Sequence, residues 1–163
     1  MQRLKRHPEK HPMYDSITET YTQYEQACSK CIDDLYRTAY LVLVDADAAE
    51  KFVTEICVAG VHKYDDLEDE AEIRFRLTSD LYHRLKRRLW FCTPNTDPLP
   101  EQLQGLTKQE RLTLAMRFSS GLTVENSGQI LKLSEAEFRR LVNGVIHKQT
   151  TVRKSLRENI KTY

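Results

Sequence analysis

The last third of the chain contains three helix starts at regular intervals, and this feature constrains the fold most. The stretch from Leu106 to Lys148 reads LTKQERLTLAMRFSSGLTVENSGQILKLSEAEFRRLVNGVIHK. Three hydroxyl residues precede its helical patterns: Thr107, Thr123 and Ser134. The first and the last are each followed three residues later by a glutamate, Glu110 or Glu137, which makes each pair a capping box. The stretch therefore predicts three successive helices.

The apolar residues inside these segments recur at intervals of three or four. They are Leu112, Leu114 and Ala115, then Ile130 and Leu131, then Phe138, Leu141, Val142 and Val145. Each helix then has one face to bury, which is the pattern of a small trihelical unit. The spacing predicts a helix-turn-helix whose recognition helix is Ser134 to Lys148.

The charges are distributed unevenly along the chain. Its formal net charge is only +1, but residues 1–105 carry 14 Lys plus Arg against 19 Asp plus Glu, whereas residues 106–163 carry 11 against 5. A locally basic surface is what binding to phosphates requires. The asymmetry favours DNA binding by the C-terminal unit; the alternative is a solvated surface with a chance excess of cations.

Helical periodicity also dominates the chain before this unit. Apolar residues recur every three or four positions at Tyr14, Ile17, Tyr21, Tyr24, Cys28, Cys31, Ile32, Leu35, Ala39 and Leu43, which predicts one long helix or two nearly continuous ones. A second helix is expected from an N-cap at Asp47 to about Lys63, and a third from about Glu72 to Trp90. The acidic stretch Asp65–Glu72 between them is expected to be a solvated loop.

A break follows at residues 93–105, TPNTDPLPEQLQG, where three prolines interrupt the helical patterns. No strand pattern of useful length occurs. We therefore expect an all-α protein with an N-terminal extension at 1–23, a helical domain at 24–92, a Pro-rich linker at 93–105 and a helix-turn-helix domain at 106–163.

Several kinds of site are not expected from the sequence. It has no Ser/His/Asp arrangement, Gly-rich phosphate loop or HExxH motif, so we expect neither an enzyme nor a cofactor. Cys28 and Cys31 lie one helical turn apart in the apolar stripe and are expected to be core thiols. A zinc site would need two more ligands from distant residues, of which Cys57, His62, His83 and Cys92 are the candidates, and we predict no metal site.

The sequence also lacks membrane signals. No apolar run approaches the roughly 18 to 20 residues of a membrane span. The basic start MQRLKRHPEKHP is not followed by the apolar core of a signal peptide. We expect a cytoplasmic protein with no membrane partner.

Three strings match one known pattern in order and spacing. LYRTAYLVLVDADAAEKFVTEICVAGVHKY (Leu35 to Tyr64) resembles LYRLAxxLLGDxxDAEDLVQEVFLxxW, and RLTSDLYHRLKRRL (Arg76 to Leu89) resembles RIARNLALDRLRRR. LTKQERLTLAMRFSSGLTVENSGQILKLSEAEFRRLV resembles LPxxxREVLLLRYxxGLSYEEIAEILGISxGTVKSRL. Over Tyr24 to Lys148 the chain thus resembles an RNA polymerase sigma factor of the extracytoplasmic-function (ECF) type, within the sigma-70-like family.

The resemblance implies a role in transcription initiation. In that family the first domain docks its second helix on the clamp of core RNA polymerase, and its next helix captures the unpaired minus-ten strand. The second domain reads the minus-thirty-five duplex in the major groove. The implied partners are core RNA polymerase, promoter DNA and an anti-sigma factor, and the implied protein catalyses no covalent chemistry.

The resemblance also assigns residues to these roles. Polymerase binding falls to Asp47, Glu50, Phe52 and Glu55. Strand capture falls to Arg84, Lys86, Arg87 and Arg88, although cations at a helix C-terminus can also simply stabilise the helix end. Duplex DNA binding falls to Arg139 and Arg140, with Lys132 and Lys148 at the two ends of the recognition helix; the alternative for the arginines is a solvated helix face.

Some residues depart from the family's pattern at functional positions. They are Lys51, Thr54, Ile73 and Asp80 in the first half, and Gly128, Lys132 and Leu141 in the second, where Glu135 and Glu137 also add carboxylates near the DNA-facing end. Asp80 is expected to repel a phosphate, and Lys132 must adopt a left-handed backbone or a different turn. Two other functions therefore stay open: a degenerate sigma-like protein acting as a stand-alone DNA-binding regulator or protein-binding adaptor, and a purely structural helical module.

Overall fold

The computed structural model describes residues 12–91 and 99–160, and within them the regular structure is entirely helical. The all-α class predicted from periodicity is thus confirmed for these residues. The elements are α1 (Pro12–Leu43), α2 (Ala46–Lys63), α3 (Glu70–Phe91), the short 3-10 helix η1 (Glu101–Leu103), α4 (Lys108–Phe118), α5 (Val124–Leu131) and α6 (Glu135–Ile160).

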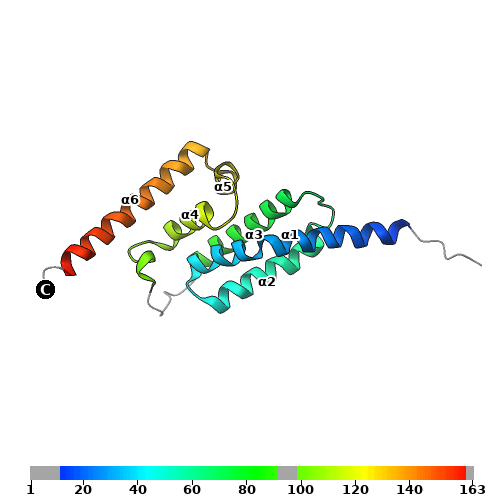
Figure 1. Cartoon of the computed structure of the whole chain (residues 1–163), viewed down its shortest axis with the longest axis horizontal. Helices are drawn as coiled ribbons and strands as arrows, with labels where there is room; N and C mark the ends of the chain where they lie inside the picture. The colour runs from blue at the N-terminus through cyan, green and yellow to red at the C-terminus, as the bar shows by residue number, and fades with distance from the viewer. Residues whose placement is uncertain (1–11, 92–98, 161–163) are drawn as a thin grey trace, which may run out of the picture.

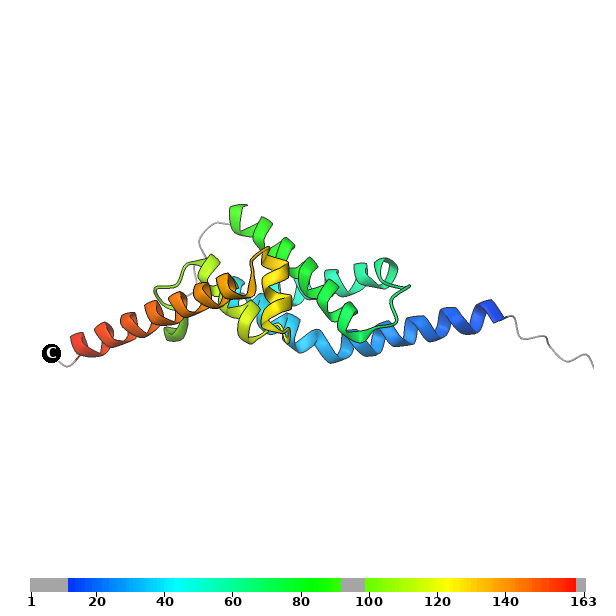
Figure 2. The same ribbon diagram turned by 90° about the horizontal axis from the view of Figure 1, so that it is seen from above.

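The helices form two groups that pack against each other. Helices α1, α2 and α3 lie side by side, and α4 packs against α1 and α3 (Figure 1). Helix α5 contacts both α3 and α4, and α6 packs against α4 and α5. The first part of α1 and the last part of α6 extend beyond the packed helices at opposite ends of the molecule (Figure 2). Figure 2, which is seen from above, shows the same two groups of helices.

Helix α1 is one continuous helix of 32 residues. Its buried stripe repeats every three or four residues: Tyr24, Ala27, Cys31, Leu35, Ala39 and Val42. Ile32, which the apolar pattern placed in this stripe, is 41% exposed. It follows Cys31 directly, and consecutive helical residues point about 100° apart, so only one of the two can face the core.

The connection from α1 to α2 has only two residues. Val44 adopts a positive φ of 52°, which is strained for a β-branched residue, and it is buried. Asp45 then has an extended backbone, and its carboxylate accepts a hydrogen bond from the Ala48 N–H at 2.9 Å. The N-cap is therefore Asp45, and the prediction of Asp47 was wrong: both residues are aspartates, and the position of the turn, not the residue type, decides between them.

Helix α3 lies alongside α1 with a constant offset of 40 residues. Lys30 pairs with Glu70 at 2.6 Å, and Asp34 pairs with Arg74 at 2.7 Å one turn later. Ion pairs that advance together in both helices indicate that the helices run in the same direction. Helix α3 begins at Glu70, because the carboxylate of Asp69 accepts a hydrogen bond from Ala71 N–H. The loop predicted to reach Glu72 is correspondingly shorter.

Most of the buried apolar residues form one cluster that includes residues of both groups of helices. Its larger members are Leu35, Ile56, Leu77, Leu81 and Leu85 from α1 to α3, and Leu112, Met116, Ile130 and Phe138 from α4 to α6. Leu103 of η1, in the described part of the predicted linker, is also buried but is not part of this cluster. The division of the chain into two domains stays a prediction.

The helix starts in the last third occur where the capping signals placed them. Glu110 N–H donates to Thr107 Oγ1 at 3.2 Å, and the Glu110 carboxylate accepts from Thr107 N–H at 2.8 Å. Ser134 and Glu137 form the same reciprocal pair. Thr123 caps α5 by accepting from Asn126 N–H at 3.1 Å. All three predicted caps are confirmed.

The turn between α5 and α6 depends on Lys132. This residue has a left-handed backbone, with φ 59° and ψ 41°, and its N–H donates to Gln129 O while Leu133 N–H donates to Gly128 O. These two bonds form a Schellman motif, in which the residue after the helix is usually glycine. A Cβ at Gly128 would lie 3.0 Å from Leu133 O, so the absence of a side chain there lets the chain turn closely over α5.

Candidate nucleic-acid interface

Helix α6 has a buried stripe and an opposite polar face. Phe138, Val142 and Val145 are buried. Arg139, Arg140, Asn143, Gly144 and His147 are exposed and follow one another at helical spacing. Asn143 and His147 were not singled out from the sequence, although their spacing of four residues from Arg139 and from each other places them on the same face.

The two arginines at the start of this face have different partners. Arg139 Nη2 lies 2.6 Å from a carboxylate oxygen of Glu135, one turn earlier. The carboxylate of Glu137 accepts hydrogen bonds from the Ser134 hydroxyl and N–H, which lower its pKa, and nearby Arg140 lowers it further. Glu137 is therefore engaged in capping α6, which leaves Glu135 as the carboxylate that competes for an arginine.

The two lysines assigned to DNA binding lie in different surroundings. Lys132 is exposed in the turn before α6. Lys148 Nζ contacts the two carboxylate oxygens of Glu110 at 2.8 and 2.9 Å, so it ties α6 to α4. Its ammonium group is paired with a carboxylate at the surface, where the Lys148 side chain is 44% exposed.

The Glu110–Lys148 pair predicts a pH-dependent contribution to stability. The hydrogen bond from Lys148 is the largest cause of the lowered pKa of Glu110. A lowered pKa in the folded state stabilises the protein above the unfolded pKa, and this contribution is lost as pH falls through the folded value. Lys148→Met is expected to lower the free energy of unfolding by a few tenths to about 1 kcal/mol at neutral pH, and by less in acid.

Urea unfolding at several pH values measures this effect, and Glu110→Gln supplies the control. In the Glu110→Gln background, Lys148→Met should change stability equally at all pH values. A pH-dependent loss that persists in that background would show that another group titrates.

The cations at the end of α3 meet the residues assigned to polymerase binding. Arg84 Nη1 lies 2.7 Å from a carboxylate oxygen of Glu55. The guanidinium carbon of Arg88 lies 5.2 Å from the centre of the Phe52 ring, within cation–π range. The two residue sets predicted for different partners thus form one surface across α2 and α3.

Two further cations of this cluster lie beside the contacts. Lys86 Nζ is 5.8 Å from the centre of the Tyr82 ring. Both Lys86 and Arg87 are exposed. These two side chains, together with the cation–π partner Arg88, form the outward-facing part of the cluster.

The start of α2 presents charges of both signs. Asp47, Glu50 and Lys51 are exposed in its first two turns, and Phe52 is half-buried. A protein partner would therefore meet two carboxylates and one ammonium group here. This is the surface to which the resemblance assigned polymerase docking.

The structure gives local partners to the residues that depart from the family's pattern on α3. Asp80 accepts hydrogen bonds from Lys63 Nζ at 2.8 Å and from the Tyr64 hydroxyl at 2.7 Å. The same contact raises the pKa of Lys63. Because Lys63 neutralises Asp80, its expected repulsion of a phosphate is reduced. Ile73 is only 1% exposed, so it belongs to the core.

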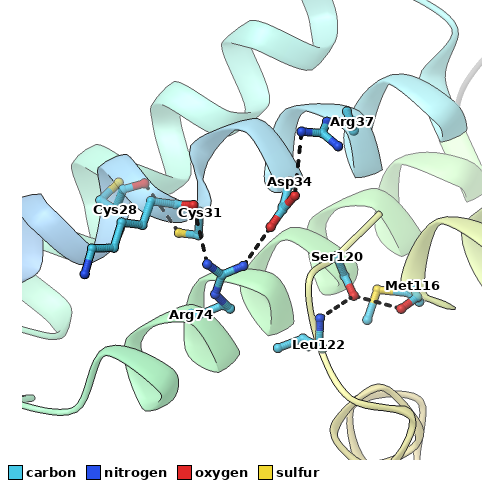
Figure 3. Close-up of polar contacts among 9 residues, drawn as sticks. Cys28, Cys31, Asp34, Arg37, Arg74, Met116, Ser120 and Leu122 are labelled. Carbon is cyan, nitrogen blue, oxygen red and sulfur yellow. Dashed lines mark hydrogen bonds and ion pairs between the residues drawn. The ribbon is translucent and has the colours of Figure 1, made fainter. Parts of the chain in front are cut away.

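The connection between α4 and α5 rests on an ion pair of the first three helices (Figure 3). Gly121 has a φ of 68°, and a Cβ there would collide with the side chains of Arg74 and Asp34. The Ser120 hydroxyl donates to Met116 O at 2.8 Å and accepts from Leu122 N–H, which fixes the turn. This contact positions the C-terminal helices on α1 and α3.

The described residues contain neither a metal-holding group of side chains nor a helix that could cross a membrane. Across 12–91 and 99–160, no group of three or more His, Cys, Asp and Glu side chains could hold a metal ion. Cys92, one of the zinc candidates, lies outside these ranges. No helix in the same ranges is long and apolar enough to cross a membrane.

Comparison of the chain with protein-family models, with curated proteins and with solved structures found no match.

Proposed function

We propose that the protein is a sigma-like transcription initiation factor that binds core RNA polymerase and directs it to specific promoters. In this proposal α4, α5 and α6 form a helix-turn-helix, and α6 enters the major groove of the upstream promoter element. The observation that carries the proposal is the face of α6 bearing Arg139, Arg140 and Asn143, which is exposed opposite a fully apolar stripe.

The chemistry of this face suits base recognition. Arginine forms paired hydrogen bonds with the O6 and N7 atoms of guanine, and asparagine does so with the N6 and N7 atoms of adenine. The exposed Lys132 lies in the turn before α6, where it can contact a phosphate and help to orient the helix. Arg139 must exchange Glu135 for DNA, and this exchange is feasible because the pair is exposed and one turn apart.

The proposed docking surface for polymerase is the start of α2. Exposed Asp47 and Glu50 suit a basic partner surface. The neighbouring outward-facing Lys86 and Arg87 of α3 suit the backbone of an unpaired DNA strand. Polymerase and strand would thus bind adjacent parts of the α2–α3 surface.

A second candidate function is a sigma-like adaptor or DNA-binding regulator that does not engage polymerase. It is favoured by the contacts of Glu55 with Arg84 and of Phe52 with Arg88, which occupy two of the four docking residues. The exposed Lys51 reverses one charge of the docking pattern. The regulator would share DNA recognition by α6 with the sigma-like factor, whereas the protein-binding adaptor would not require it.

Co-purification with bacterial core RNA polymerase at moderate salt distinguishes the two functions. The full chain is expected to bind, Asp47→Ala with Glu50→Ala is expected to weaken binding, and Lys51→Glu is expected to tighten it. The matched control is Asp66→Ala with Glu68→Ala, which removes two exposed carboxylates from the α2–α3 connection. Failure of the unmodified chain to bind would contradict the sigma proposal and leave the adaptor or regulator.

A further inference from the structure

The two groups of helices meet where a glycine turn rests on an ion pair. Gly121 lies between α4 and α5 with a φ of 68°, and a Cβ at this position would collide with the Arg74 and Asp34 side chains. Arg74 Nη1 lies 2.7 Å from a carboxylate oxygen of Asp34, so this ion pair links α3 to α1 (Figure 3). The turn can approach the ion pair this closely only because residue 121 has no side chain.

The seam between α1 and α3 continues from this ion pair to two hydroxyl groups. Asp34 and Arg74 are 40 residues apart, and one helical turn further on the same offset places Thr38 near Thr78. Both threonines are fully buried, and among the described residues neither hydroxyl oxygen has a hydrogen-bond partner. Helix α4, which packs against both α1 and α3, thus lies over a seam that contains unpaired polar groups.

Helix α4 contributes a buried cation of its own. Arg111 is only 4% exposed, and its Nε and Nη1 atoms have no hydrogen-bond partner in the part of the chain that the structure describes. Burial lowers the pKa of its guanidinium group. A buried charge without an opposite charge, or a buried donor without an acceptor, loses its hydration with nothing in return. Rehydration of Arg111 therefore opposes the packing of α4.

The three C-terminal helices are connected to one another by contacts that do not involve α1, α2 or α3. Lys148 of α6 contacts the Glu110 carboxylate of α4 at 2.8 and 2.9 Å. The Ser127 hydroxyl of α5 donates to Met116 O of α4 at 2.9 Å. Both contacts can therefore persist if α4 leaves α1 and α3.

We propose that the docking of α4 on α1 and α3 is a reversible closed state, from which α4, α5 and α6 detach as one helical unit. Burial of apolar residues such as Leu112 and Ala115 favours the closed state. Hydration of Arg111 and of the two threonine hydroxyls favours the open state. Because these effects oppose each other, a single substitution at the joint can shift the balance.

Detachment changes the spacing between the polar face of α6 and the surface formed by α2 and α3. The movement is a property of the protein alone and requires neither DNA nor polymerase. Failure of the proposed transcription role would therefore leave this inference unaffected.

Small-angle X-ray scattering of the full chain, with circular dichroism on the same samples, tests the proposal through Gly121→Ala. The new Cβ displaces the turn from the Asp34–Arg74 pair, so the radius of gyration should increase while helical content stays the same. The control is Gly144→Ala, because Gly144 is exposed on α6 and an added Cβ there meets no atom within 4 Å. An unchanged radius of gyration for Gly121→Ala, or a loss of helix throughout the chain, would overturn the proposal.

Arg111→Met tests the opposite direction. It replaces the unpartnered cation with an apolar side chain, so urea unfolding should shift to a higher urea concentration. Combined with Gly121→Ala, it should return the radius of gyration toward that of the unmodified chain. The control is Arg117→Met, because Arg117 is only partly buried and lies 5.1 Å from the centre of the Phe118 ring, and it should produce neither effect. An unfolding midpoint that falls or stays the same in Arg111→Met would contradict the proposal.

Discussion

Replacing Arg139 and Arg140 with alanine is expected to weaken binding to the upstream promoter duplex by roughly 1 to 3 kcal/mol for each base that an arginine recognises. If each arginine recognises one base, the affinity should fall by roughly 30-fold to 20,000-fold. Both side chains are exposed on α6, and neither contributes to its buried stripe, so helical content should not change. Fluorescence anisotropy over a salt series measures both the affinity and the number of phosphates that the protein neutralises.

The matched control removes two arginines elsewhere. Arg76 pairs with Glu72 one turn earlier at 2.6 Å, as Arg139 pairs with Glu135, and Arg37 is an exposed arginine of α1. Arg37→Ala with Arg76→Ala has the same net charge as the test variant and should retain most of the affinity. Equally weakened binding by the two variants would mean that net charge, not the face of α6, determines binding.

Replacing Phe138 with alanine is expected to lower the free energy of unfolding by about 3 to 5 kcal/mol. Phe138 is fully buried at the start of α6, and its cluster joins α6 to the helices beneath it. Removing its ring leaves a cavity that the surrounding helices can only partly fill. Chemical denaturation followed by circular dichroism measures the change.

Leu141 provides the comparison on the same helix. It was placed with the apolar residues of α6, but it is 42% exposed, because the buried stripe runs through Phe138, Val142 and Val145. Leu141→Ala should therefore change stability by no more than about 0.5 kcal/mol. Similar destabilisation of the two variants would contradict the orientation of α6.

The features predicted well from the sequence are those controlled by neighbouring residues. A capping box needs only a hydroxyl and a carboxylate three residues apart, so Thr107 and Ser134 revealed their helix starts. Asp45 was missed because Asp47, which Glu50 follows three residues later, also fits the sequence pattern of an N-cap. The position of the turn at Val44, with its positive φ, decides between them, and nothing in the sequence marks a valine for that conformation.

The partners of the charged residues could not be predicted in the same way. Glu55 and Arg84 are 29 residues apart, and Glu110 and Lys148 are 38 residues apart. Such pairs depend on the register of whole helices, which periodicity does not determine. Arg84 and Lys148 could be identified as cations from the sequence. Their carboxylate partners could not be predicted from it.

The cysteines show the same limit. The apolar stripe correctly predicted Cys31 as a core thiol, but Cys28 is only half-buried. The Tyr24 hydroxyl donates to the carbonyl oxygen of Cys57 at 2.7 Å, and this contact depends on how α2 packs against α1, which the spacing along α1 cannot show. The packing of α4 against α1 and α3 is likewise a property of the tertiary structure.

Transcription from a library of promoter sequences, with core RNA polymerase and the purified full chain, tests the central claim most directly. It requires polymerase docking, strand separation and recognition by α6 at once. Our account predicts transcription from a small set of promoters that share an upstream element, and loss of that selection when Arg139 and Arg140 are replaced. Transcription that the added chain neither increases nor redirects to particular promoters would contradict it.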